Sequence, residues 1–243
     1  MKVAALSRSN SPGTFIGIDG CASGWIVATF RGLALNVTYA KRLEDIDLEG
    51  VAAVGLDMPI GLVSHGKRPA DVEAKAFLGR RSSTIFLAPV AAALEAPDFA
   101  SANALNREHG GFGLSRQAFG LFAKIREVRD WAASTSVPTY EIHPEMAFMD
   151  MLGTRELPSK KTWQGHEERR RVLNLVGCED VTVSAQAGTR AASDDVLDAI
   201  AVAWVVREIV AGRGVSIPTT PTRDERGLTA ALWRRSMPEN GHC

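Results

Sequence analysis

The chain has 243 residues, of which 45% are hydrophobic and 23% are charged. This length and composition are ordinary for a globular protein with a sizeable core, in one large domain or two small ones. The 28 basic and 28 acidic residues cancel, so the chain lacks the overall basic excess that usually accompanies nucleic-acid binding. No uninterrupted run of 18 apolar residues is present, which argues against a membrane span.

Cysteine usage favours a reducing compartment. Cys21, Cys178 and Cys243 lie far apart and show no paired spacing of the kind found in zinc sites. We therefore expect free thiols in a cytoplasmic protein rather than a disulfide framework. The first 13 residues contain no apolar core long enough for a signal peptide.

Short apolar segments separated by tight turns open the chain. Residues 14–19 predict a buried strand that ends in an acid, and residues 25–30 and 33–39 predict two more strands. Because the connecting turns are short, these three strands are expected to form an antiparallel meander. Residues 51–57 predict a fourth strand that also ends in an acid. Its continuous apolar run is typical of a strand covered on both faces in the parallel part of a sheet.

Helical patterns follow. Between residues 61 and 136 no strand is predicted, and residues 70–78, 100–108 and 115–134 predict helices. Residues 137–143 predict a fifth strand. The remaining predicted elements are helices at 167–176 and 193–212, a Pro- and Thr-rich loop at 217–222 and a short final strand at 228–233.

This order of elements predicts an α/β fold. Three antiparallel strands followed by parallel strands and helices form the order of the ribonuclease H-like fold, with a mixed five-stranded sheet and helices on both faces. We expect a single domain over residues 1–243, with helical insertions at about 62–136 and 146–190. Right-handed crossovers would place the first strand beside the fourth. Since ligands bind at the carboxyl ends of parallel strands, Asp19 and Asp57 are expected side by side at that edge.

Two more acids lie on the last predicted helix. Its apolar residues recur at steps of three and four, and this stripe, extended backwards, reaches Asp198 and Asp195. A carboxylate that enters a core needs a cation, a metal ion or a shared proton. We therefore expect the helix to bring both acids to the edge that holds Asp19 and Asp57. Asp194 points about 100° away from its neighbour and is assigned to stabilisation of the helix N-terminus.

Carboxylates gathered at one place cannot all stay ionised without a counter-charge. Hard oxygen ligands suit Mg²⁺ or Mn²⁺, and two such ions about 3.5–4 Å apart catalyse in-line displacement at phosphorus. Asp19 is expected to be the central ligand, with Asp57 and Asp198 completing the metal shells and Asp195 as a further ligand. Each acid also has a structural explanation, as a turn residue for the strand-end acids or as a helix N-terminal charge for Asp195.

Other polar groups complete the expected site. Lys124, Arg80, Arg81 and Lys161 are candidate contacts for substrate phosphates, and Ser82 is a candidate hydrogen-bond donor to them.

A further group follows the fifth strand. Glu145 could ligate a metal ion there, and His143 could do so or move a proton. The alternative is a structural hydrogen-bonded cluster that also includes Glu141.

Segments along nearly the whole chain are similar to known families. Residues 15–20 with Gly24 and Trp25, together with residues 195–201, resemble the first-strand and last-helix motifs of RuvC-type resolvases. Further segments are 55–61, 80–89, 124–128, 140–145 and 161–165 with Arg169. With the final helix, these resemble family 429 of domains of unknown function, which is described as predicted nucleases of ribonuclease H fold. The resemblance implies that fold and that activity. The fourth-strand acid, usually Glu in resolvases, is Asp57 here.

These features favour a divalent-metal-dependent nuclease or phosphodiesterase that acts on DNA or RNA. Two alternatives stay open. One is a nucleotide-binding phosphoryl-transfer enzyme of related fold, although such proteins duplicate the fold and 243 residues leave little room for a second lobe. The other is an inactive nuclease-fold module with a binding or regulatory role. We expect nucleic acid as partner and no membrane contact, and a homodimer is left open.

Overall fold

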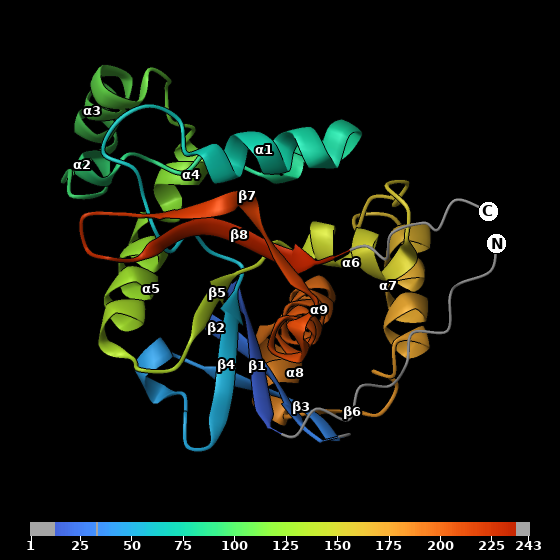
Figure 1. Ribbon diagram of the computed structural model, residues 1–243. Coiled ribbons are helices and arrows are strands. Elements are labelled where there is room, and N and C mark those ends of the chain that lie inside the picture. The colour runs from blue at the N-terminus through green and yellow to red at the C-terminus, as the bar shows by residue number, and fades with distance from the viewer. Residues whose placement is uncertain (1–12, 33, 237–243) are drawn as a thin grey trace.

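A mixed β-sheet runs through the centre of the computed structural model, which describes residues 13–32 and 34–236 (Figure 1). The sheet order is β6-β3-β2-β1-β4-β5-β8-β7. β2 is antiparallel to both β1 and β3, and β4 and β5 continue the sheet from β1 in parallel. The predicted α/β class with a mixed sheet is confirmed. The strands are β1 (Thr14–Cys21), β2 (Gly24–Arg31), β3 (Ala34–Ala40), β4 (Val51–Leu56), β5 (Thr139–Glu141), β6 (Val181–Val183), β7 (Gly214–Arg223) and β8 (Thr229–Arg235).

The predicted number of five strands is wrong, since the sheet has eight strands among the described residues. The short final strand predicted at 228–233 is β8, which lies inside the sheet between β5 and β7. β7 includes the Pro- and Thr-rich stretch that predicted a loop. An edge position accommodates its prolines, and its pairing with β8 is interrupted between Ile217 and Thr222. β6, three residues long at the opposite edge, is too short to give an alternating pattern.

Helices pack on both faces of the sheet and enclose two hydrophobic cores. Side chains alternate along β1, so that Phe15 belongs to the core beneath α9, whereas Ile16 and Ile18 belong to the core beneath α5. The helices are α1 (Pro69–Leu78), α2 (Ala91–Leu94), α3 (Phe99–Gly110), α4 (Arg116–Gly120), α5 (Phe122–Ser134), α6 (Pro144–Leu152), α7 (Trp163–Leu175), α8 (Ala185–Arg190) and α9 (Ser193–Glu208).

Each predicted helix corresponds to one or two helices of the structure, whose bounds differ in places, and α2, α6 and α8 were not predicted. The stretch from residue 61 to residue 136 is fully described and contains no strand, as predicted. The predicted helix at 115–134 is divided at Leu121 into α4 and α5. The last predicted helix ends at Glu208, and a π-helical turn follows that contains Gly212 with a φ of 77°.

The first and fourth strands are parallel neighbours, as predicted. Ile18 lies opposite Leu56, and the Asp57 N–H donates a hydrogen bond to the Ile18 carbonyl at 3.0 Å. The pairing therefore continues to the two strand-end acids and holds their backbones in register.

Helix α9 crosses directly over β1, and Gly17 permits the close approach. A Cβ at this position would lie 2.1 Å from the Ala203 nitrogen and 2.3 Å from the Ala199 oxygen. Only a residue without a side chain fits beneath the helix. The N-terminal turn of α9, which carries its acids, is thereby set close to the end of β1.

Two smaller expectations concern thiols and membranes. Cys21 and Cys178 are buried free thiols, and Cys243 lies outside the described residues. Among the described helices, none has the length and apolar character needed to cross a membrane.

Candidate active site

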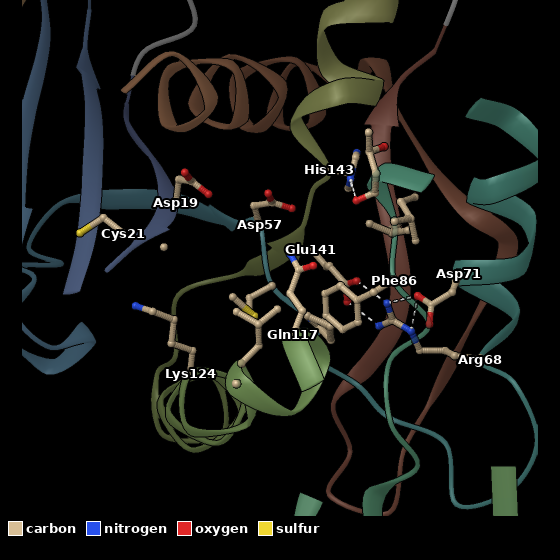
Figure 2. A pocket seen from close by; sticks show the side chains of 18 of the residues that line it. Asp19, Cys21, Asp57, Arg68, Asp71, Phe86, Gln117, Lys124, Glu141 and His143 are labelled. Carbon is tan, nitrogen blue, oxygen red and sulfur yellow. Dashed lines mark hydrogen bonds and ion pairs between the residues drawn. The ribbon is translucent and has the colours of Figure 1, made fainter. Parts of the chain in front are cut away.

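A cavity of about 490 Å³ opens at the carboxyl ends of β1 and β4 (Figure 2). Asp19 and Asp57 project into it side by side, and Lys124 approaches from α5. Glu141 and His143, from β5 and the residues that follow it, also line the cavity. This is the sheet edge at which the strand order predicted a ligand site.

The two strand-end acids are buried or partly buried and unpaired. Asp19 is 8% exposed and Asp57 is of intermediate exposure. Within residues 13–32 and 34–236, neither carboxylate has a hydrogen-bond or ion-pair partner, and Figure 2 shows both side chains free of such contacts. Burial raises the pKa of each carboxyl well above 3.8, and repulsion from Asp198 raises both further.

Helix α9 adds Asp198 and Asp195 to this region. Asp198 is 3% exposed, and its Oδ2 accepts a hydrogen bond from Lys160 Nζ at 2.7 Å. Burial raises the pKa of Asp198 to about 6 although Lys160 opposes the shift. Asp195 is partly buried, and its carboxylate accepts a hydrogen bond from the Ala192 N–H at 2.9 Å, so it also caps the helix. Repulsion from Asp57, Asp198 and Asp195 adds to the effect of burial and raises the pKa of Asp19 further.

Asp194 lies in the first turn of α9, as predicted, but it also contacts the cation that pairs with Asp198. Its Oδ2 lies 3.2 Å from Lys160 Nζ, so Asp194 and Asp198 share one ammonium. Residues four apart lie on the same helix face, which explains why these two acids converge. Burial opposes the charge of Lys160, but the two acids outweigh that effect and raise the pKa of the ammonium.

The acids are close enough to repel one another, yet they do not form a complete coordination shell. Among the described residues, no three or more His, Cys, Asp and Glu side chains are already arranged to hold a metal ion. The donor chemistry nevertheless fits Mg²⁺ or Mn²⁺, because Asp19 offers a buried, unpaired carboxylate beside other carboxylates in a cavity. Asp19, Asp57, Asp195 and Asp198 thus remain candidate ligands.

Glu145 does not join these acids. It lies in the first turn of α6, is 5% exposed and does not line the cavity. Its Oε1 accepts a hydrogen bond from Arg81 Nε at 2.6 Å, and its Oε2 accepts one from Arg169 Nη2 at 2.6 Å. Because two guanidinium groups already satisfy both oxygens, the structure supports an anchoring role rather than the predicted metal ligation.

Lys124 is the predicted phosphate contact that the structure brings to the cavity. Its ammonium donates to the Gly24 carbonyl at 2.6 Å and lies 4.0 Å from the centre of the Trp25 ring. Burial lowers its pKa, and nearby groups that include Cys21 and Asp19 oppose that shift. Lys124 therefore places a positive charge beside the unpaired strand-end acid.

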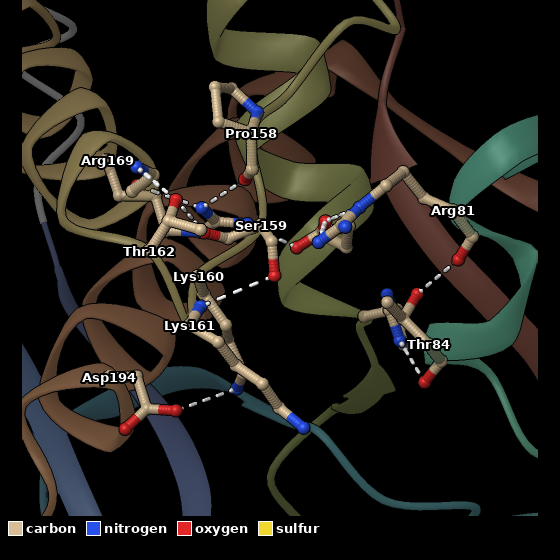
Figure 3. Close-up of polar contacts among 12 residues, drawn as sticks. Arg81, Thr84, Pro158, Ser159, Lys160, Lys161, Thr162, Arg169 and Asp194 are labelled. Carbon is tan, nitrogen blue, oxygen red and sulfur yellow. Dashed lines mark hydrogen bonds and ion pairs between the residues drawn. The ribbon is translucent and has the colours of Figure 1, made fainter.

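The other predicted phosphate contacts lie outside the cavity lining. Arg80 and Lys161 are exposed, and Arg81 is paired with Glu145. The backbone carbonyl of Ser82 accepts a hydrogen bond from Lys75 Nζ at 2.8 Å. Figure 3 shows Lys161 extending beside Lys160.

The family comparison agrees with the resemblance seen in the sequence. A family model described as "Protein of unknown function (DUF429)" matches residues 17–223, well over half of the chain. The chain belongs to the DUF429 family. The match includes all four candidate metal ligands. No curated protein and no solved structure matches the chain.

In this DUF429 chain, a buried ion network that sequence reasoning missed forms one wall of the cavity. Arg68 is 2% exposed, donates to Glu141 Oε2 at 2.7 Å and pairs with Asp71 (Figure 2). Glu141 Oε2 also accepts a hydrogen bond from the Ile60 N–H at 3.0 Å, and Asp71 accepts one from the Ala88 N–H at 2.7 Å. Glu141 is therefore a structural acid that ties the loop between β4 and α1 to β5.

His143 is a neutral group beside the cavity. Its Nε2 lies 3.3 Å from the Thr84 carbonyl, and burial lowers its pKa to about 4. Among the described residues, its buried Nδ1 has no partner. A neutral imidazole that donates through Nε2 carries a lone pair on Nδ1.

Proposed function

We propose that the chain is a divalent-metal-dependent nuclease of ribonuclease H-like fold that hydrolyses phosphodiester bonds in DNA or RNA. The observation that carries this proposal is that Asp19 and Asp57, from neighbouring parallel strands, face an open cavity, and that Asp195 and Asp198 of α9 lie close enough to repel Asp19. The meander of β1 to β3, the parallel strands β4 and β5 and a helix across β1 support the ribonuclease H-like assignment.

Each acid has a distinct part in this proposal. Asp19 and Asp57 would hold Mg²⁺ or Mn²⁺ because they are unpaired and face the cavity, and Asp195 and Asp198 would supply further carboxylate oxygens. Such ions, when bound, supply Lewis acidity and an activated water for attack at phosphorus. Lys124 faces the same space and would bind a phosphate oxygen.

Two exposed side chains outside the cavity lining suit a nucleic-acid chain. Lys161 is exposed, and two residues further on Trp163 is 79% exposed at the start of α7. An exposed aromatic ring beside a lysine is the combination that binds a base by stacking and its phosphate by charge. These side chains would compensate locally for the absence of a net positive charge.

The test is Mn²⁺-dependent cleavage by the Asp19→Asn variant. Wild-type protein is incubated with single- and double-stranded DNA and RNA in Mg²⁺ or Mn²⁺, and Asp19→Asn is expected to abolish cleavage while its circular dichroism spectrum stays unchanged. Asp180→Asn, at an exposed position, is the matched control and should cleave normally. Absence of cleavage of every substrate by the wild type, together with no Mn²⁺ binding that depends on Asp19, would overturn the proposal.

A further inference from the structure

Lys160 reaches the acid cluster from the loop between α6 and α7. Its ammonium nitrogen lies 2.7 Å from Asp198 Oδ2 and 3.2 Å from Asp194 Oδ2, and Figure 3 shows the contact with Asp194. Its charge also opposes the upward shift in the pKa of Asp19 and Asp57. Within residues 13–32 and 34–236, no other cation forms an ion pair with Asp194, Asp195 or Asp198.

The backbone on both sides of Lys160 is anchored. Thr162 Oγ1 donates to the Ser159 carbonyl at 2.8 Å, and Arg169 Nη1 donates to the Pro158 carbonyl at 2.9 Å (Figure 3). Gly165 packs so closely that a Cβ there would lie 2.0 Å from the Ser159 oxygen. The loop is therefore held against the start of α7.

Glu145 completes this anchor. Its carboxylate pairs with Arg169, which is almost fully buried, and Arg169 in turn holds the loop through Pro158. The acid that was predicted to ligate metal thus positions the residue before Ser159. Pro158 lies two residues before Lys160, so this contact fixes the backbone from which the Lys160 side chain extends.

The side chain of Lys160, in contrast, is free to change position. It is 37% exposed, whereas the Asp198 carboxylate that it contacts is 5% exposed. A lysine carries its charge on a flexible four-carbon stem, so the ammonium can leave Asp198 by rotation of that stem alone. The anchored loop needs no movement.

We propose that Lys160 is a tethered counter-ion that occupies the acid cluster of the metal-free protein and competes with the divalent ion for Asp198. This inference rests on the metal site of the proposed function. An ammonium and a divalent ion that approach the same carboxylate repel each other strongly in a buried site. Loading of the ion at Asp198 therefore requires Lys160 to withdraw, which lowers the apparent affinity for metal and keeps the cluster neutralised until then.

The test measures Mn²⁺ affinity by isothermal titration calorimetry, without substrate. Lys160→Gln removes the competing charge and is expected to bind Mn²⁺ about tenfold or more tightly than the wild type. Lys160→Arg keeps the charge and should stay close to wild type. Lys161→Gln is the matched control, since it removes one positive charge from the same loop at an exposed position, and it should also stay close to wild type.

A second readout is the melting temperature in EDTA. Lys160→Gln leaves Asp198 without its ion pair, so the metal-free variant should melt below the wild type and regain more stability from Mn²⁺. If Lys160→Gln does not fold, Lys160→Met keeps the aliphatic stem and serves the same comparison.

The outcomes separate this inference from the proposed function. Equal or weaker Mn²⁺ binding by Lys160→Gln, in a protein whose wild type binds Mn²⁺ and cleaves nucleic acid, overturns the counter-ion role and leaves the nuclease intact. Failure of all the variants and of the wild type to bind Mn²⁺ overturns both. Tighter binding by Lys160→Gln supports the counter-ion even if no nucleic-acid substrate is cleaved.

Discussion

The Asp19 carboxylate is 8% exposed, and no hydrogen bond or ion pair satisfies it in the part of the chain that the structure describes. A buried charge without a partner lowers the stability of a folded protein. Proteins retain such costly groups where function depends on them, so replacing them often raises stability. Replacement of Asp19 should therefore damage activity most, although the Asp19 side chain is a source of instability in the metal-free protein.

We predict that Asp19→Asn stabilises the metal-free protein at pH 7. Burial and neighbouring acids raise the pKa of Asp19 in the folded state above 3.8, so the folded state holds its proton more tightly than the unfolded chain. The stability that this protonated carboxyl contributes is fully present below pH 3.8, and it is lost as the pH rises through the raised pKa. The uncharged variant avoids that loss and should gain about 1 kcal/mol, or about 2–4 °C in Tm.

Urea unfolding in EDTA at a series of pH values measures this effect. The difference between Asp19→Asn and wild type should be largest near pH 7 and should shrink towards pH 3.8. Asp180→Asn, at an exposed site, is the control. A wild type as stable as Asp19→Asn at pH 7 would show that burial and neighbouring acids do not destabilise the charged form of Asp19.

At the scale of elements, the position of α9 decides whether the helix acids reach the strand acids. The helix contacts β1 along its length because Gly17 leaves no side chain between them. The Asp57 N–H extends the pairing of β1 with β4 through the Ile18 carbonyl. Two packing relations, helix on strand and strand beside strand, therefore assemble four acids from three distant parts of the sequence.

We predict that Gly17→Ala destabilises the protein by about 3 kcal/mol or more, because overpacking of this kind forces backbone to move. The added Cβ would lie 2.1 Å from a backbone nitrogen of α9, which cannot rotate away. Gly20→Ala, on the same strand, meets its nearest atom at 3.4 Å on the flexible Lys124 side chain and should change stability little. Urea unfolding of both variants is the measurement. Equal stability of the two would contradict the close packing.

At the scale of the whole molecule, the positions of the candidate site residues were predictable from sequence where local pattern and topology were sufficient. Asp19 ends the apolar run within β1, Asp57 directly follows β4, and the crossover rule places those strands side by side. Glu145 was misplaced because its partner Arg169 comes from a later helix, and no local pattern indicates that contact. Lys160 was missed for the same reason, since a loop far from α9 carries it.

The sheet shows the same division between local and distant information. The central strands were predicted because burial on both faces gives them continuous apolar runs. The edge strands were not predicted, because β6 is only three residues long and β7 contains prolines that are typical of a loop. Edge strands are defined by the neighbour to which they pair, and the sequence of the strand itself does not specify that neighbour.

The balance of charges leads to a last prediction, on salt. With 28 basic and 28 acidic residues, the proposed nucleic-acid binding would rest on a few local cations, of which Lys124, Lys161 and Arg80 are the candidates. Each phosphate contact contributes about −0.9 to the slope of log K against log salt, so three contacts give a slope of about −3. Lys161→Gln should reduce that slope by about 1, whereas Lys41→Gln, at an exposed site outside the cavity lining, should not.

Fluorescence anisotropy with a labelled oligonucleotide in EDTA, over a series of NaCl concentrations, measures this slope without cleavage. A slope that is about −3 and becomes shallower only in Lys161→Gln supports a narrow phosphate track beside the acids. A much steeper slope would require an extended basic surface. The zero net charge argues against such a surface, because unpaired basic residues elsewhere would have to be offset by acids that repel the same phosphates.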